Sequence, residues 1–496
     1  MIQYLLSIDQ STSTTKAIIF DNAGKPINRC NVDHRQYYPF PGWVEHNAEE
    51  IYQNTIQAIR DVLEKSGIGQ EQIRVISITN QRETVIVWDK NTGKPIYNAV
   101  VWQCQRAAEL CREIEQKGCD ETVKKKTGLV LSPYFSAAKV KWILDNVEGA
   151  RDKADKGELL LGTMDSWLVW KLTGQKVHAT DYSNASRTQL FNIHDLKWDE
   201  EILEIFGIPA SMLPKVMFSD EIFGYTQKDR FFNREIPVSG VLGDSHAALF
   251  GQNCFDKGMA KTTYGTGSSI MMNIGNTPKR SEKGLVTSIA WGMKGSLDYV
   301  FEGNINCTGA TIKWMVDDLG LISSSGEAES YARSVPGTEG VYVVPAFVGL
   351  GAPYWDSAAR ASITGISRGT KKAHLVRAAE ESIVYQIKDV LEIMIEECGS
   401  KLKELRVDGG PTRDSFLMQF QADMLDTEVA CSKIEELSAL GSCFMAGLAV
   451  GIWHSLEELQ SLRERGKTFL PIMAEDNRKE LYSGWKEAVR RTLSKN

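Results

Sequence analysis

The stretch YLLSIDQSTSTTKAIIFDNAGKPI, residues 4–27, contains two apolar runs separated by a polar turn. This pattern predicts a strand, a turn, a second strand and another turn at residues 22–24. The first turn carries no Asn-Gly pair. Instead, a run of small hydroxyl residues follows Asp9 almost directly: Ser11, Thr12, Ser13, Thr14 and Thr15. The chain therefore begins with a predicted β-hairpin whose turn is rich in hydroxyl groups.

A second segment, GMAKTTYGTGSSIMMNIGNTP at residues 258–278, repeats this order of strand, turn and strand about half a chain later. Two similar hairpins at this separation predict two homologous halves. A chain of 496 residues is also too long for one ordinary core. We expect domains at residues 1–250 and 251–496, with a cleft between them.

Helical and strand patterns alternate between and after the hairpins. Asn47 and Glu50 form a plausible capping box before a helix, and the strand RVISITN follows at residues 74–80. In the second half, an amphipathic helix at residues 374–398, closed by Gly399, leads into the strand ELRVDGG. The order of elements predicts an α/β fold with mixed sheets.

Composition narrows the class of function. The formal net charge is -7, and no long block of basic residues occurs, so we expect no nucleic-acid partner. The longest apolar-rich stretch, residues 443–453, is shorter than the ~18 residues that a membrane span needs. We therefore predict a cytoplasmic protein with no membrane partner. Nine cysteines without metal-ligand spacing indicate reduced core residues.

The hairpin turns are candidates for phosphate binding. Phosphate favours backbone N–H donors at tight turns, hydroxyl groups and a bound divalent cation. Ser11 to Thr14 supply hydroxyls, Thr266 and Gly267 lie in the second turn, and Gly410 closes a third glycine turn. No GxxxxGK[ST] motif occurs, and a single turn of this kind is more often an ordinary turn than a phosphate site.

Two aspartates are candidates for chemistry. Asp9 ends a strand beside the hydroxyl run and could hold Mg²⁺, or could simply support the turn. Asp244 in GVLGDSHAALFG could cap a helix, or could act as a general base toward an attacking hydroxyl. His246 is interpreted as structural or substrate-facing, because phosphoryl transfer needs positioning more than a strong base.

Arg82 and Glu83 end a predicted strand, where both side chains can turn into a cleft. There they would contact vicinal hydroxyls, and Trp102 would cover the carbon chain. A solvated ion pair at a strand edge is the alternative reading of these two charges.

Two longer motifs carry a family resemblance. YFSAAKVKWILDN at residues 134–146 is one, and ASITGISRGTKKAHLVRAAEE at residues 361–381 is the other, with Glu380 where an apolar residue is usual. Further similar stretches include PGWVEHN, ITNQRET and DYSNASRTQLFNIH. The chain resembles the FGGY carbohydrate kinases along nearly its whole length, and among them the glycerol kinases.

The resemblance implies two domains of the ribonuclease-H/actin type with a central interdomain cleft that closes on ATP, Mg²⁺ and a small polyol or sugar. It implies ATP-dependent phosphorylation of a primary hydroxyl, with glycerol converted to glycerol 3-phosphate. The N-terminal domain would bind the polyol and the C-terminal domain the nucleotide. A homodimer or homotetramer is the expected assembly.

The resemblance also assigns residues. Asp9 would lie near the metal, and Asp244 would be the catalytic base. The residues implied to bind the substrate are Arg82, Glu83, Trp102, Tyr134, Asp244 and Ser245. The residues implied to bind ATP are Ser11, Thr12, Ser13, Thr14, Thr266, Gly267, Gly309, Lys313, Gly410, Pro411 and Asp414.

The chain departs from the glycerol kinase pattern at three places. DQSTS replaces the usual DQGTT at Ser11, GDSHAA replaces GDQQAA at Ser245, and Ser269 replaces an aromatic residue after YGTG. These changes favour a roomier and more polar site, so a kinase for a longer polyol or pentulose, such as erythritol, xylitol or a xylulose-like sugar, is the alternative. An actin- or Hsp70-like ATPase is the alternative from another class.

Overall fold

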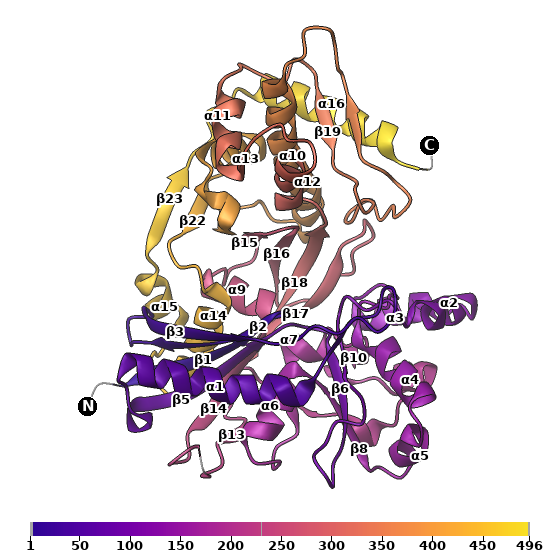
Figure 1. Ribbon diagram of the computed structural model, residues 1–496, viewed down its shortest axis with the longest axis vertical. Helices are drawn as coiled ribbons and strands as arrows, with labels where there is room; N and C mark the ends of the chain where they lie inside the picture. Colours follow the sequence, from indigo (N-terminus) through magenta and orange to yellow (C-terminus); the bar gives the residue numbers. More distant parts are fainter. Residues whose placement is uncertain (1–2, 230, 495–496) are drawn as a thin grey trace.

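The computed structural model describes residues 3–229 and 231–494. Two large sheets form the centres of two lobes that lie one above the other in Figure 1. The first sheet has the order β13 (Gly224–Tyr225), β14 (Pro237–Gly243), β5 (Ile73–Asn80), β1 (Tyr4–Gln10), β2 (Thr14–Phe20) and β3 (Pro26–Asp33). The predicted first hairpin is confirmed, because β1 pairs antiparallel with β2.

The second sheet is built on the second predicted hairpin. Its order is β17 (Val286–Met293), β18 (Ser296–Ile305), β16 (Ser268–Gly275), β15 (Ala260–Tyr264), β21 (Leu405–Gly409), β22 (Val429–Ser432) and β23 (Arg465–Phe469). Here β15 is antiparallel to β16 and parallel to β21, as β1 is antiparallel to β2 and parallel to β5. The run β18-β16-β15-β21-β22 thus repeats the run β3-β2-β1-β5-β14, and the prediction of two duplicated halves in an α/β fold is confirmed.

A smaller sheet extends the first lobe. Its order is β4 (Glu45–His46), β7 (Ala99–Val100), β6 (Val85–Asp89) and β8 (Leu159–Thr163). Four helices accompany it: α2 (Ala108–Gln116), α3 (Asp120–Thr127), α4 (Ser136–Asn146) and α5 (Ala150–Asp155). In Figure 1 this part forms the magenta side of the lower lobe.

The helix signals in the sequence also correspond to real elements. Asn47 caps α1 (Ala48–Ser66), because its side chain accepts the N–H groups of Glu49 and Glu50. The long helix α12 (Lys372–Cys398) crosses the second lobe and ends at Gly399, whose φ of 66° is in the left-handed region. Short helices α10 (Gly309–Asp317), α11 (Ala328–Arg333) and α13 (Ser415–Leu425) surround α12, and α16 (Glu475–Thr492) closes the chain.

Two helices join the lobes. α9 (Asp244–Gly251) packs closely on α14 (Leu437–Ala449), which itself lies on the first sheet although it belongs to the second half of the sequence. Gly441 permits this approach, because a Cβ atom there would lie 1.8 Å from the carbonyl oxygen of Ala247. The predicted boundary at residues 250 and 251 falls at the end of α9 and stays a prediction.

Two observations concern the remaining expectations from composition. All nine cysteines are free thiols, as predicted, and seven of them are buried. Among the described residues, no helix is both long and apolar enough to cross a bilayer.

Candidate active site

The first hairpin turn is held by its own hydroxyl groups and by neighbours from a distant segment. Ser11 donates both its N–H and its Oγ–H to the carbonyl oxygen of Thr14, each at 2.9 Å. The carbonyl oxygen of Thr12 contacts Nε2 of His34 and accepts the side-chain amide of Gln36. The Thr14 hydroxyl, which was predicted to bind ATP, donates to the carbonyl oxygen of Val32 at 3.2 Å.

Asp9 lies at the end of β1 beneath this turn and is 7% exposed. Burial raises its pKa to about 6, and the carboxylates of Glu436 and Asp244 act in the same direction while Lys16 opposes them. Lys16 Nζ lies 3.7 Å from Asp9 Oδ2 and 2.8 Å from Glu436 Oε2. Asp9 is therefore a buried carboxyl group whose negative charge needs a nearby cation.

The second hairpin turn meets the N-terminus of α10. The N–H groups of Gly309 and Ala310 donate to the carbonyl oxygens of Gly265 and Thr266, at 3.0 and 3.1 Å. A Cβ atom at Gly309 would lie 2.6 Å from the Gly265 oxygen, so only glycine fits this contact. The predicted residues Thr266, Gly267 and Gly309 are thereby brought together.

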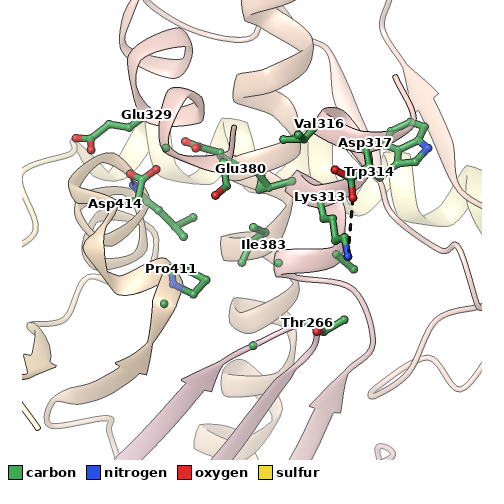
Figure 2. Close-up of a pocket in the computed structure, with 18 of the residues that line it drawn as sticks. Thr266, Lys313, Trp314, Val316, Asp317, Glu329, Glu380, Ile383, Pro411 and Asp414 are labelled. Atoms are coloured by element: carbon green, nitrogen blue, oxygen red, sulfur yellow. Dashed lines mark hydrogen bonds and ion pairs between the residues drawn. The ribbon is translucent and has the colours of Figure 1, made fainter. Parts of the chain in front are cut away.

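A cavity with a volume of about 1170 Å³ opens beside this turn. Figure 2 shows Thr266 at one end and Glu380 with Asp414 at the other, with Pro411 and Ile383 between them. Of the residues predicted to bind ATP, the following line this cavity: Thr266, Gly309, Lys313, Gly410, Pro411 and Asp414. Lys313 is largely exposed, and its Nζ lies 3.8 Å from Asp317 Oδ2.

A buried network of charges lies between the lobes. Both terminal nitrogens of Arg82 donate to Glu302, at 3.0 and 2.7 Å, and Arg82 Nε lies 3.1 Å from Asp244 Oδ1. Arg187 contacts Glu83 at 2.6 Å and Glu302 at 2.8 Å. Burial opposes ionisation of Glu302, but Arg187 and Arg82 outweigh it and hold the pKa of this carboxyl far below its usual range.

Asp244 is the first residue of α9, directly after the N-cap Gly243. One of its oxygens faces Arg82, and its side chain is 36% exposed, so the carboxylate is accessible from the cleft. Its neighbour Ser245 donates its backbone N–H to Asp244 Oδ1. His246 is fully buried against the Ser288 hydroxyl, and burial together with Arg82 lowers its pKa, which agrees with the structural interpretation of this residue.

Two further predicted residues, Tyr134 and Trp102, lie beside this network, and a buried lysine supports its member Glu83. Glu83 has a φ of 61°, an uncommon conformation for a residue with a side chain. The buried ammonium of Lys139 supports the strained segment, because it donates to the carbonyl oxygens of Glu83, Tyr134 and Phe135. The Tyr134 ring packs edge-on against Trp102, with 5.4 Å between centroids.

Trp102 also connects the two predicted subsites. Its Nε1 donates to Thr12 Oγ1 at 3.0 Å, so an aromatic residue predicted to cover the polyol is hydrogen-bonded to a residue predicted to contact phosphate. The structure thus places the predicted polyol residues next to the first hairpin turn.

Sequence reasoning missed several charged partners in this region. Arg187, Glu302, Lys16 and Glu436 were not singled out, although Arg187 lies within the motif DYSNASRTQLFNIH. Glu302 carried a usable signal, because it is a single acidic residue inside the buried part of β18. A buried charge inside a strand requires a partner, which the sequence does not identify.

The carboxylates near the first hairpin fit a magnesium ion. Mg²⁺ uses one or two protein carboxylates and keeps waters or phosphate oxygens as its other ligands. Asp244 is close enough to Asp9 for its negative charge to raise the pKa of Asp9. These two carboxylates match the small number of protein ligands that Mg²⁺ uses. No cluster of three or more metal-binding side chains occurs in the part of the chain that the structure describes.

Comparisons with known proteins agree with this geometry. The chain is 55% identical to the glycerol kinase of Caldanaerobacter subterraneus subsp. tengcongensis and 54% identical to glycerol kinase 2 of Thermotoga maritima, each over 99% of both chains. The crystal structure of Plasmodium falciparum glycerol kinase with ADP superposes with a TM-score of 0.95 at 37% identity, over 100% of this chain and 99% of that one. A xylulose kinase from Lactobacillus acidophilus shares the fold, with a TM-score of 0.90 at 21% identity over 100% and 99% of the two chains.

Family models complete the assignment and confirm the predicted ribonuclease-H/actin-like architecture. The N-terminal domain model of the FGGY family of carbohydrate kinases matches residues 4–251, and the C-terminal domain model matches residues 260–450. These matches favour a kinase over a filament or chaperone ATPase, and the chain belongs to the FGGY family of carbohydrate kinases.

Proposed function

We propose that this protein is a glycerol kinase, which transfers the γ-phosphoryl group of ATP to a primary hydroxyl of glycerol and forms glycerol 3-phosphate and ADP. The observation that carries the proposal is the Arg82–Asp244 contact at 3.1 Å, which leaves an accessible carboxylate between the two lobes. The named relatives, more than half identical over the full chain, support glycerol as the substrate.

Asp244 is proposed as the general base. Its carboxylate would accept the proton of the primary hydroxyl as that oxygen forms a bond to the γ-phosphorus, while the bond between the γ-phosphorus and the β,γ-bridging oxygen breaks and ADP leaves. Arg82 Nε fixes one carboxylate oxygen and leaves the other for the substrate. Such positioned bases contribute about 10²- to 10⁴-fold to the rate.

The polyol would lie against Trp102 and Tyr134, whose rings form one apolar wall. Arg82 and Glu83 would contact its hydroxyl groups from the charged network. Because Glu302 and Arg187 already bind these two side chains, their orientations are fixed before the substrate arrives. A preorganised site loses less entropy when the polyol binds.

The nucleotide would occupy the 1170 Å³ cavity with its phosphates toward Thr266 and Gly267 and its base toward Asp414. Backbone N–H groups and the side chains of Ser11, Thr12, Ser13 and Thr14 would contact the phosphates from the first hairpin. Lys313 and Pro411 line the walls between the two ends.

Mg²⁺ is proposed as the cation that Asp9 would hold, together with phosphate oxygens. When bound, it would neutralise charge on the phosphates during transfer. The raised pKa of Asp9, about 6, supports a site that is more stable with a cation beside the carboxylate.

The decisive experiment measures glycerol-dependent formation of ADP in a coupled assay, with product identified as glycerol 3-phosphate. Stimulation of ATP turnover by glycerol is expected. ATP hydrolysis that is independent of every polyol would point to the filament or chaperone class instead.

A longer polyol or pentulose is the second candidate substrate. Ser269 stands where an aromatic residue is usual, and its Oγ lies 3.5 Å from the buried ammonium of Lys261, which adds a polar contact to this region. Values of kcat/KM for glycerol, erythritol, xylitol and xylulose decide between the candidates. A clear preference for glycerol would remove the second one.

Three further properties are proposed from the family resemblance. The protein is expected in the cytoplasm, as a homodimer or homotetramer, without a nucleic-acid or membrane partner. The division into a polyol domain at residues 1–250 and a nucleotide domain at residues 251–496 belongs to the same proposal.

A further inference from the structure

The end of the cavity opposite the second hairpin is unusually acidic. Glu380 on α12 lines it and is 2% exposed, and Asp414, the N-cap of α13, lies beside it. Figure 2 shows the two carboxyl groups near each other at the end away from Thr266, with Glu329 at the upper left.

The two carboxyl groups supply acceptor lone pairs rather than N–H donors. Glu380 Oε2 is buried, and no donor from the described residues reaches it. Asp414 Oδ1 accepts the backbone N–H of Leu417, at 2.8 Å, and the N–H of Phe416 and the carboxyl group of Glu380 also hydrogen-bond to the Asp414 carboxylate. The two basic side chains that line the cavity are engaged elsewhere, because Arg413 pairs with Glu435 and Lys313 lies close to Asp317.

Burial raises the pKa of both carboxyl groups. Burial, followed by the adjacent Asp414 carboxylate, raises the pKa of Glu380 to about 10, so this carboxyl keeps its proton at neutral pH and donates it to Asp414. The remaining oxygen atoms then act as acceptors. Burying such a pair without a counter-charge destabilises the fold, so a ligand that donates hydrogen bonds there would explain why the pair is tolerated.

We propose that Glu380 and Asp414 together receive the exocyclic amino group of adenine and make the cavity select 6-aminopurine over 6-oxopurine nucleotides. The inference rests on the proposed function only in placing a nucleotide base at this end of the cavity. The amino group of adenine donates two hydrogens to the free acceptors. The O6 atom of hypoxanthine or guanine would instead face their lone pairs and leave them unsatisfied.

The test compares ATP with ITP, which differs from ATP by exchange of the amino group for a carbonyl oxygen at position 6. The ratio of kcat/KM for ATP to that for ITP is measured with glycerol in the wild type, Glu380→Gln and Glu380→Leu. Glu380→Gln gains an N–H donor for O6, so we expect its ratio to fall by about 10- to 100-fold. Glu380→Leu removes the acceptor without adding a donor, and a smaller fall is expected.

The matched control is Glu396→Gln, on the same helix but exposed and paired with Lys283. Its ratio should equal that of the wild type. An unchanged ratio in both Glu380 variants would overturn the inference while leaving the kinase activity intact.

A second measurement separates this inference from the proposed function. Calorimetric titration with ADP and IDP needs no polyol and no turnover. A preference for ADP that Glu380→Gln weakens would support the inference even if no polyol were phosphorylated. Equal affinities of the wild type for ADP and IDP would overturn it even in an active glycerol kinase.

Discussion

Arg82 Nε lies 3.1 Å from Asp244 Oδ1, while both terminal nitrogens of Arg82 bind Glu302. The base candidate is therefore held by a guanidinium whose other end is fixed in the opposite lobe. This relationship couples the orientation of Asp244 to the packing of β18 on the first lobe.

Asp244→Asn tests the role of the base. The amide keeps the shape and can still accept from Arg82, but it cannot take the proton of the hydroxyl. We expect kcat to fall by about 10²- to 10⁴-fold, with ADP affinity nearly unchanged. Steady-state kinetics and ADP titration measure the two quantities. Turnover within a few-fold of the wild type would exclude Asp244 as the base.

Glu302→Gln tests the buried network. The substitution removes the negative charge that Arg82 and Arg187 both contact. Because breaking a buried ion pair leaves an uncompensated charge, we expect the free energy of unfolding to fall by about 3–5 kcal/mol. We also expect KM for glycerol to rise more than KM for ATP, because Arg82 and Glu83 lose their fixed orientation. Urea unfolding and steady-state kinetics measure both effects.

Glu396→Gln is the control for this substitution, because Glu396 is exposed and pairs with Lys283 at the surface. Its free energy of unfolding should change by less than about 1 kcal/mol. If Glu302→Gln behaved like this control, the network would not stabilise the lobes.

Local patterns predicted the elements that carry this site, and long-range contacts explain what they missed. A hydroxyl- or glycine-rich turn between two apolar runs was enough to predict each of the hairpins β1–β2 and β15–β16. Asn47 correctly predicted the start of α1, and Gly399 correctly predicted the end of α12. Glu302 and Arg82 are 220 residues apart, so no local spacing connects them. The orientation of Thr14 toward β3 was equally hidden, because it depends on the side of the strand that each hydroxyl faces.

Trp102 and Thr12 offer a direct test of communication between the subsites. Trp102→Phe keeps the ring against Tyr134 but removes the Nε1–H that reaches Thr12 Oγ1, and Thr12→Val removes the acceptor. In a double-mutant cycle on kcat/KM for glycerol, we expect a coupling free energy of about 0.5–1.5 kcal/mol.

Trp198→Phe is the control, because Trp198 Nε1 donates to the carbonyl oxygen of Pro214 and should show no coupling to Thr12. Strictly additive effects of Trp102→Phe and Thr12→Val would mean that this hydrogen bond does not link the subsites.

Asp165 should make the stability of the first lobe depend on pH. Its carboxyl is fully buried and accepts the hydroxyls of Thr163 and Thr180, at 2.5 and 2.6 Å. Burial, followed by Asp181, raises its pKa to about 7 from an ordinary value of 3.8. The unfolded chain therefore loses this proton near pH 4 while the folded chain keeps it to about pH 7, so the contribution of Asp165 to the free energy of unfolding falls as pH rises through this window. In the wild type, the free energy of unfolding should therefore decrease between pH 4.5 and pH 7.5. In Asp165→Asn, whose side chain is neutral throughout, this decrease should be smaller, by about 1.4 kcal/mol for each unit by which folding raises the pKa of Asp165. Chemical unfolding of the wild type and the variant at several pH values measures this directly, and parallel curves would show that Asp165 is ionised in the folded protein across the whole range.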